Sequence, residues 1–197
     1  QENKLKDEIE KQLLEAAETG DHELIWSLLS EAADSNVDIF TSIPPSISTS
    51  PAHVAAANGN FRALHALWCG NFPMDIPLHD GRTPLFSAVS SPRERAGATV
   101  RVLIENAKVN VNHIAQHGDT ALFNAALAGR VEIITQLTAA GASVDCATHH
   151  GTTPLMVASE RGDIESVKAL LKCKADVTRT STSRSTALFA AAELGHT

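Results

Sequence analysis

The sequence contains no tyrosine, and aromatic residues make up only 4% of the chain. Proteins that bind exposed bases or carbohydrate need aromatic side chains for stacking, so the scarcity of aromatic residues argues against both functions. Long apolar runs are missing too. The stretch Ala52–Ala57 is interrupted by His53, and the uninterrupted run Ala187–Ala192 has six residues, so both fall well short of the roughly 20 residues that span a bilayer. We therefore expect no membrane insertion.

Cysteine is also scarce. Cys69, Cys146 and Cys173 are odd in number and far apart, which argues against a disulfide framework. Such cysteine use favours a reducing, intracellular compartment, for which we expect the cytoplasm, with the nucleus as the alternative. The net charge is −7, and an acidic surface repels phosphate backbones, so we expect no nucleic-acid partner.

Catalytic motifs are missing as well. The sequence has no phosphate-binding loop, no G-x-G-x-x-G, no G-x-S-x-G and no C-x-x-C. The neighbouring carboxylates Asp7, Glu8 and Glu10 fall in a charge-rich stretch that is typical of a solvated helix face. We predict that this segment is not an enzyme.

Potential metal ligands gather near two successive turns: His113, His117, Cys146, His149 and His150. Imidazole and thiolate groups do bind zinc. However, His113 and His117 are predicted to lie on non-helical chain, where nothing makes them converge. We interpret all five as polar turn residues and expect no metal and no cofactor, with a zinc site as the alternative.

A short phrase recurs along the chain. It consists of a small or hydroxyl residue, Pro or Ala, an apolar residue and soon a pair of small residues. Five copies begin at Ser50, Thr83, Thr120, Thr153 and Thr186. Their second positions are 51, 84, 121, 154 and 187, so the copies are 33, 37, 33 and 33 residues apart. A period of this length indicates a repeat architecture.

Each part of the phrase has a physical role. Ser or Thr can cap a helix, and Pro suits the first helical position, where no amide partner is needed. A glycine follows eight residues after the Pro or Ala, and we expect it to end the helix in a left-handed turn: Gly59, Gly129, Gly162 and Gly195. Second helices are predicted at 61–68, 131–137 and 164–171, each followed by a short extended segment.

These residues resemble the ankyrin repeat, with its T-P-L-H-x-A-A opening, G-H/D-x-E junction and G-A-D-V-N exit. The stretch GDIESVKALL at 162–171 is a close match. The resemblance covers nearly the whole chain and implies an all-α ankyrin-repeat solenoid of helix–turn–helix units joined by short β-hairpin-like loops. We expect one domain over 1–197, with repeats at about 5–40, 41–78, 79–114, 115–147 and 148–180 and a partial copy at 181–197.

Several repeats depart from the pattern. The charge-rich front at 4–12 fits a terminal cap. The Pro- and Ser-rich linker 41–50 predicts an irregular hairpin. The third repeat has four extra residues and Pro92 in place of the glycine, so a lengthened loop is predicted at 90–98. The last copy stops before its second helix, so we expect further ankyrin repeats or another domain in the natural chain.

The resemblance implies that a protein or peptide partner binds the concave side, formed by hairpin tips and first helices. The predicted contact residues are His79, Asp80, Phe86, Ser87, Gln116, His117, Phe123, Asn124, Leu127, His149, His150, Met156, Val157 and Arg184, with Glu160 further along. Phe86, Phe123, Met156 and Phe189 stand where the family has His. We expect them to fill the core between repeats, with groove contacts as the alternative.

A second surface competes with the first. Registering the second helices places Trp26, His65 and Val102 in one row, where the family has an exposed Lys. An exposed tryptophan there would anchor a partner, unless Trp26 folds back onto the terminal cap. Two alternative functions are a regulatory or substrate-recruiting domain of a larger enzyme or effector, and a methyl-lysine reader. A methyl-lysine-binding module needs an aromatic cage, and two tryptophans on different helices are poorly suited to form one.

Overall fold

The computed structural model describes residues 2–35, 37, 39 and 50–196. Every regular element in these ranges is helical, and the helices form successive pairs, which confirms the predicted all-α fold. The chain divides into two compact units. Unit 1 is Gln1–His79 with Thr83–Val109, and unit 2 is Asp80–Arg82 with Asn110–Thr197. The irregular hairpin predicted at 41–50 lies almost entirely outside the described residues.

Unit 1 contains three helix pairs. The elements in chain order are α1 (Glu2–Thr19), α2 (His22–Asp34), α3 (Pro51–Ala57), α4 (Phe61–Cys69), α5 (Pro84–Ser90), α6 (Arg93–Arg101) and the π-helix η1 (Val102–Asn106). The charge-rich front of the chain is the first part of α1, which continues without a break to Gly20 at φ 83°. Helices α1, α3 and α5 pack in succession, and α4 contacts α2, α6 and η1.

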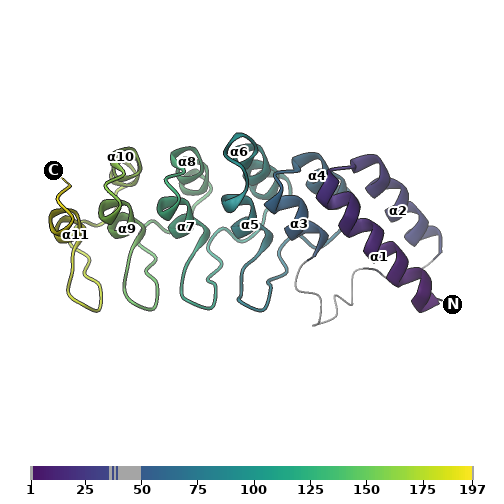
Figure 1. Ribbon diagram of the computed structural model, residues 1–197, viewed down its shortest axis with the longest axis horizontal. Helices are drawn as coiled ribbons and strands as arrows, with labels where there is room; N and C mark the ends of the chain where they lie inside the picture. Colours follow the sequence, from purple (N-terminus) through teal and green to yellow (C-terminus); the bar gives the residue numbers. More distant parts are fainter. Residues whose placement is uncertain (1, 36, 38, 40–49, 197) are drawn as a thin grey trace. The chain divides into compact units, whose positions relative to one another are not determined.

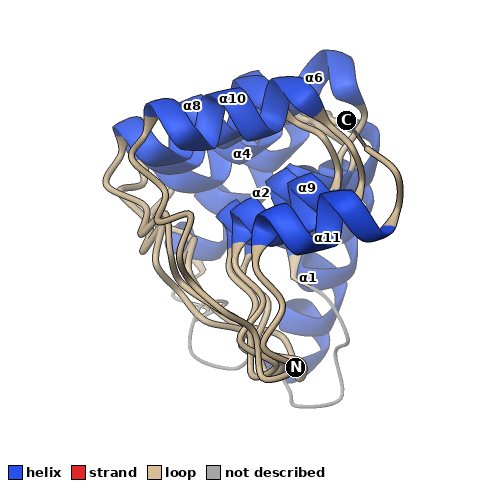
Figure 2. Ribbon diagram, turned by 90° about the vertical axis from the view of Figure 1, so that its left-hand side faces the viewer, coloured by secondary structure: helices blue, strands red, loops and turns tan. Residues whose placement is uncertain are grey.

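Unit 2 contains two complete pairs and one further helix: α7 (Ala121–Leu127), α8 (Val131–Ala139), α9 (Pro154–Glu160), α10 (Ile164–Lys172) and α11 (Ala187–Glu193). Helices α7, α9 and α11 pack in succession in one layer, and α8 packs on α10 in the other. Figure 2 shows this layering for the labelled helices, with α9 and α11 below α8 and α10. No helix in the described part combines the length and apolarity needed to cross a bilayer.

Hydroxyl caps begin the first helices, as predicted. The side chains of Ser50, Thr120, Thr153 and Thr186 each accept a hydrogen bond from the backbone N–H three residues later. Thr83 makes no such bond. The predicted glycines end four of these helices in the left-handed region, with φ between 65° and 73°. Such caps satisfy amide and carbonyl groups that a short helix leaves without internal partners.

Alanine pairs in the first helices are part of the core. Ala55 and Ala56 of α3 and Ala125 and Ala126 of α7 are fully buried. Because alanine has only a methyl side chain, neighbouring seven-residue helices can approach closely at these positions. Large side chains from the second helices, such as Leu137, complete the core.

The prediction of a lengthened loop at 90–98 is wrong. Ser91 and Pro92 alone separate α5 from α6, which begins at Arg93. The connection is therefore one residue shorter than the three residues 58–60 between α3 and α4. The extra residues instead lengthen the second helical segment, because the nine residues of α6 are followed by the five of η1.

Proline explains the error. Pro92 stands before the first turn of α6, where the absent N–H has no structural role. The residue thus starts a helix rather than extending a loop. A wider π turn then takes up chain length at the end of the same helical run. The segment returns to the regular path at Lys108, whose φ of 51° matches the left-handed Asn71 (60°) of the preceding repeat.

Candidate partner-binding surface

Three hairpins in unit 2 have the same internal bonds. The N–H groups of Ala115, Thr148 and Ser181 each donate to the carbonyl four residues later, at 2.9, 3.0 and 2.9 Å. The tip of each hairpin contains a residue with left-handed φ: Gly118, Gly151 and Arg184. Identical bonds at identical spacing give the three loops the same shape, and they lie side by side in Figure 1 next to α7, α9 and α11.

Neighbouring tips are joined by one backbone hydrogen bond each. Gln116 N–H donates to Asp80 O at 2.9 Å, His149 N–H to His117 O at 3.3 Å, and Thr182 N–H to His150 O at 2.9 Å. Together these bonds form a ladder through four tips, all within unit 2. The ladder holds the backbone of each tip in register with the next.

Side chains tie the exits of the hairpins together as well. The carboxamide of Asn112 donates to Gly141 O at 3.0 Å and accepts from Ser143 N–H at 2.7 Å. One repeat later, Asp145 accepts from Asp176 N–H at 2.9 Å. Each repeat is thus fixed to its neighbour at the tip and again at the exit.

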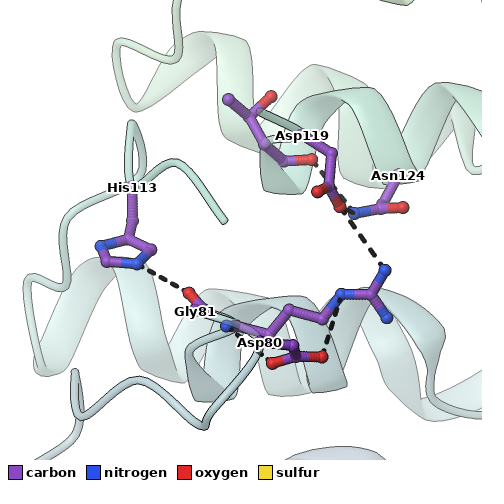
Figure 3. Close-up of polar contacts among 7 residues, drawn as sticks. Asp80, Gly81, His113, Asp119 and Asn124 are labelled. Atoms are coloured by element: carbon purple, nitrogen blue, oxygen red, sulfur yellow. Dashed lines mark hydrogen bonds and ion pairs between the residues drawn. The ribbon is translucent and has the colours of Figure 1, made fainter. Parts of the chain in front are cut away.

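A polar cluster lies behind the first two tips (Figure 3). The guanidinium of Arg82 is 3.6 Å from a carboxylate oxygen of Asp80 and 3.6 Å from Oδ2 of Asp119. Asp119 is only 5% exposed, and its Oδ2 also accepts from the Asn124 carboxamide at 2.8 Å. On the other side of the tip, His113 Nε2 donates to Gly81 O at 2.8 Å.

The cluster fixes both the tips and α7. Asp119 belongs to a hairpin and Asn124 to α7, so their bond sets the loop against the helix. Oδ1 of Asp119 has no hydrogen-bond partner among the described residues, so the buried carboxylate depends on Arg82 and Asn124. Sequence reasoning missed Arg82 and Asp119 because 37 positions separate them.

Comparison with family models decides the family. A model of three ankyrin repeats matches residues 13–114, 93–181 and 134–197. The chain belongs to the ankyrin repeat family. No curated protein matches it. Ankyrin repeats are generally protein-binding modules and are typically non-catalytic.

The predicted contact residues of the ankyrin stack differ in their access to solvent. The residues at the tips are mostly exposed: His79, Gln116, His117, His149, His150 and Arg184. Leu127 is also exposed, whereas Asp80, Ser87, Phe123 and Asn124 are half-buried. His79 and Ser87 belong to unit 1, and the other residues just named belong to unit 2.

Three predicted contact residues of the ankyrin stack are buried. Phe86 and Met156 are 3% and 4% exposed and fill the core, which was the preferred expectation for them. Val157 was expected to face the groove, but it is only 5% exposed and offers a partner little surface. Phe189, at the position equivalent to Phe86, is exposed instead.

The competing row on the second helices lies in unit 1. Trp26 is 45% exposed, so part of its side chain is open to a partner. His65 is exposed, and its ring lies edge-on to Trp68 at 5.4 Å between centroids. Val102 is half-buried within η1, so the row weakens at the third repeat.

The histidines and cysteines are the potential metal ligands of the chain. Among the described residues, no group of three or more His, Cys, Asp or Glu side chains is placed to hold an ion. The imidazole of His113 is engaged with Gly81 O, and the three thiols form no disulfide. The expectation of a metal-free ankyrin domain remains a prediction.

Proposed function

We propose that this chain is a protein-interaction scaffold that binds a protein or peptide partner through the hairpin face of unit 2. We define the hairpin face as the four tips, at 80–82, 116–118, 149–151 and 182–184, with the adjoining sides of α7, α9 and α11. The observation that carries the proposal is the ladder of backbone bonds between successive tips.

The ladder matters because it arranges side chains before any partner arrives. His117, His149, His150 and Arg184 are exposed, yet their backbones are held by the bonds within and between hairpins. Binding to a pre-arranged surface avoids the entropic cost of ordering loops. The buried Asp119 cluster adds a second support, since it locks the tips to α7.

The test is affinity capture with the whole chain as bait, followed by quantitative mass spectrometry. The double variant His117→Ala with Asn124→Arg alters the hairpin face. The charge-matched control, Thr135→Arg, introduces the same positive charge at an exposed position of α8. We expect proteins captured by the wild type to be lost from the first variant and retained by the control.

Retention of all partners by both variants would overturn the hairpin-face proposal. A third bait, Trp26→Ala with His65→Ala, tests the competing row, which is favoured by the exposure of Trp26. Loss of partners from this bait alone would assign binding to the second helices of unit 1.

We further propose that both units belong to one domain inside a reducing compartment. The chain enters unit 2 at Asp80–Arg82 and returns to unit 1 at Thr83, which supports a shared fold. The free thiols of Cys69, Cys146 and Cys173 support the intracellular location. Limited proteolysis tests the single domain, which should give one protected fragment. Unfolding without reductant tests the reducing compartment, because all three thiols should then react with a maleimide.

A further inference from the structure

A groove of about 390 Å³ opens on the hairpin face between α9 and α11. Its charged lining consists of two carboxylates at equivalent positions of successive repeats, Glu160 at the end of α9 and Glu193 at the end of α11. Both glutamates are exposed. The walls near the hairpins carry five hydroxyl groups, those of Thr152, Ser181, Ser183, Ser185 and Thr186.

The hydroxyls of the last hairpin hydrogen-bond to one another. Ser183 Oγ lies 2.8 Å from Ser181 Oγ and donates to Ser185 Oγ at 3.4 Å. Ser181 Oγ also accepts the N–H of Ser185 at 3.2 Å. Bonds of this kind hold the hydroxyls in place, and each oxygen has lone pairs beyond those already used. The hairpin wall therefore presents fixed acceptors.

Apolar groups complete the groove. Met156 at its base is only 4% exposed, so half-buried Ala190 and exposed Leu194 on the α11 side supply most of the accessible apolar surface. A ligand that enters the groove can thus bury a short aliphatic stem along these side chains while its polar end meets the carboxylates and hydroxyls.

The polar groups that line the groove indicate which kind of ligand it can bind. Among the lining residues that the structure describes there is no Lys, Arg, His, Asn or Gln, so carboxylates and hydroxyls supply all the side-chain polarity. Arg161 and Arg184 adjoin the groove in sequence, but neither lines it. A site with two anionic acceptors, further hydroxyl acceptors and an apolar base is complementary to a cation with several donors on an aliphatic stem.

We propose that this groove binds an arginine side chain of the partner peptide. Guanidinium has five N–H donors in a planar fork that pairs with carboxylates, and its three methylenes match the apolar base. An anionic side chain such as phosphoserine is disfavoured by Glu160 and Glu193. This proposal rests on the proposed function, because it specifies the chemistry of a partner on the same hairpin face.

The test uses four peptides, Ac-Gly-Ser-X-Ser-Gly-amide, in which X is arginine, citrulline, lysine or glutamate. The readout is the methyl resonance of Met156 in the whole chain during NMR titration. We expect the arginine peptide to shift this resonance and to bind at least about tenfold more tightly than its uncharged isostere citrulline. The glutamate peptide should cause no shift, and lysine should bind more weakly than arginine.

Paired variants make the test specific. Glu160→Gln with Glu193→Gln should lose the preference for arginine over citrulline. Glu132→Gln with Glu165→Gln makes the same charge change on exposed positions of α8 and α10 and should retain it. Equal binding of the arginine and citrulline peptides, or an unchanged preference in the groove variant, would overturn the proposal.

The two proposals fail separately. A partner captured through the hairpin face that is lost with His117→Ala/Asn124→Arg but retained by Glu160→Gln/Glu193→Gln would leave the proposed function intact and remove the arginine site. Loss with both variants supports both proposals.

Discussion

The close approach of adjacent hairpin tips can be measured with one pair of alanine substitutions. Gly118 and Gly141 both have left-handed backbones, with φ of 82° and 89°. A Cβ on Gly118 would meet the backbone nitrogen of His149 at 2.6 Å, whereas a Cβ on Gly141 would meet nothing within 4 Å. Gly118→Ala therefore adds a clash between repeats, and Gly141→Ala is its matched control.

The expected magnitudes follow from these contacts. In either variant, left-handed backbone costs an alanine roughly 1–2 kcal/mol, which is partly offset by roughly 0.4–1 kcal/mol from the stiffer unfolded chain. Gly118→Ala must also move the next hairpin, which breaks the bond from His149 N–H to His117 O at a cost of about 1 kcal/mol and adds repulsion. We expect a net loss of about 2–3 kcal/mol for Gly118→Ala and about 1 kcal/mol or less for Gly141→Ala.

The assays are thermal unfolding and amide hydrogen exchange. A difference of about 2 kcal/mol corresponds to about 4–8 °C in Tm for a chain of this size. Because repeat arrays can unfold in segments, exchange of the His149 amide supplies a local measure, and it should accelerate in Gly118→Ala alone. If Gly141→Ala is as damaging as Gly118→Ala, or if His149 exchanges equally in both, the steric reasoning is refuted.

Three further predictions concern titration and backbone strain. Burial raises the pKa of Glu10 above its ordinary 4.5 despite the opposing Lys6, so its ionisation opposes folding as pH rises; Glu10→Gln should raise Tm at neutral pH and leave it unchanged below 4.5. Hydrogen bonds from the hydroxyl and the N–H of Thr178 lower the pKa of Asp176 below its ordinary 3.8. Thr178→Ala removes the hydroxyl, so the pKa of Asp176 should rise in an NMR titration. An unchanged pKa would argue against this cause. Arg184 has a φ of 63° where the other tips have glycine, so Arg184→Gly should stabilise the chain by about 0.5–1 kcal/mol in urea unfolding, and a loss of stability would contradict the strain.

Local signals predicted most of the fold. Hydroxyl caps, Pro at the first helical position and a glycine eight residues later depend on neighbouring residues only, so their spacing predicts helices such as α9 and its turn at Gly162. The third repeat was predicted wrongly because Pro92 has two local roles. It interrupts a helix from within and begins one from outside, and only the packing of α6 on α5 selects between them.

The binding surface was less accessible to sequence reasoning. The exposed tips, for example His117 and His149, could be placed from the repeat register. Burial could not, because Val157 and Asn124 occupy equivalent positions and yet one is buried and the other half-buried. Contacts between repeats, such as Arg82 with Asp119, depend on side-chain length and direction across the stack, which spacing does not specify.

The way the third repeat takes up its additional length has a consequence for protein engineering. Gln116 N–H and Asp80 O form their hydrogen bond although the four additional residues lie between them in the sequence. Added chain between these tips therefore does not disturb their pairing. We therefore expect the end of η1 near Asn106 to accept a grafted reporter or a second recognition element. A graft there would add a new element to the domain without changing the surface that we propose binds its partner.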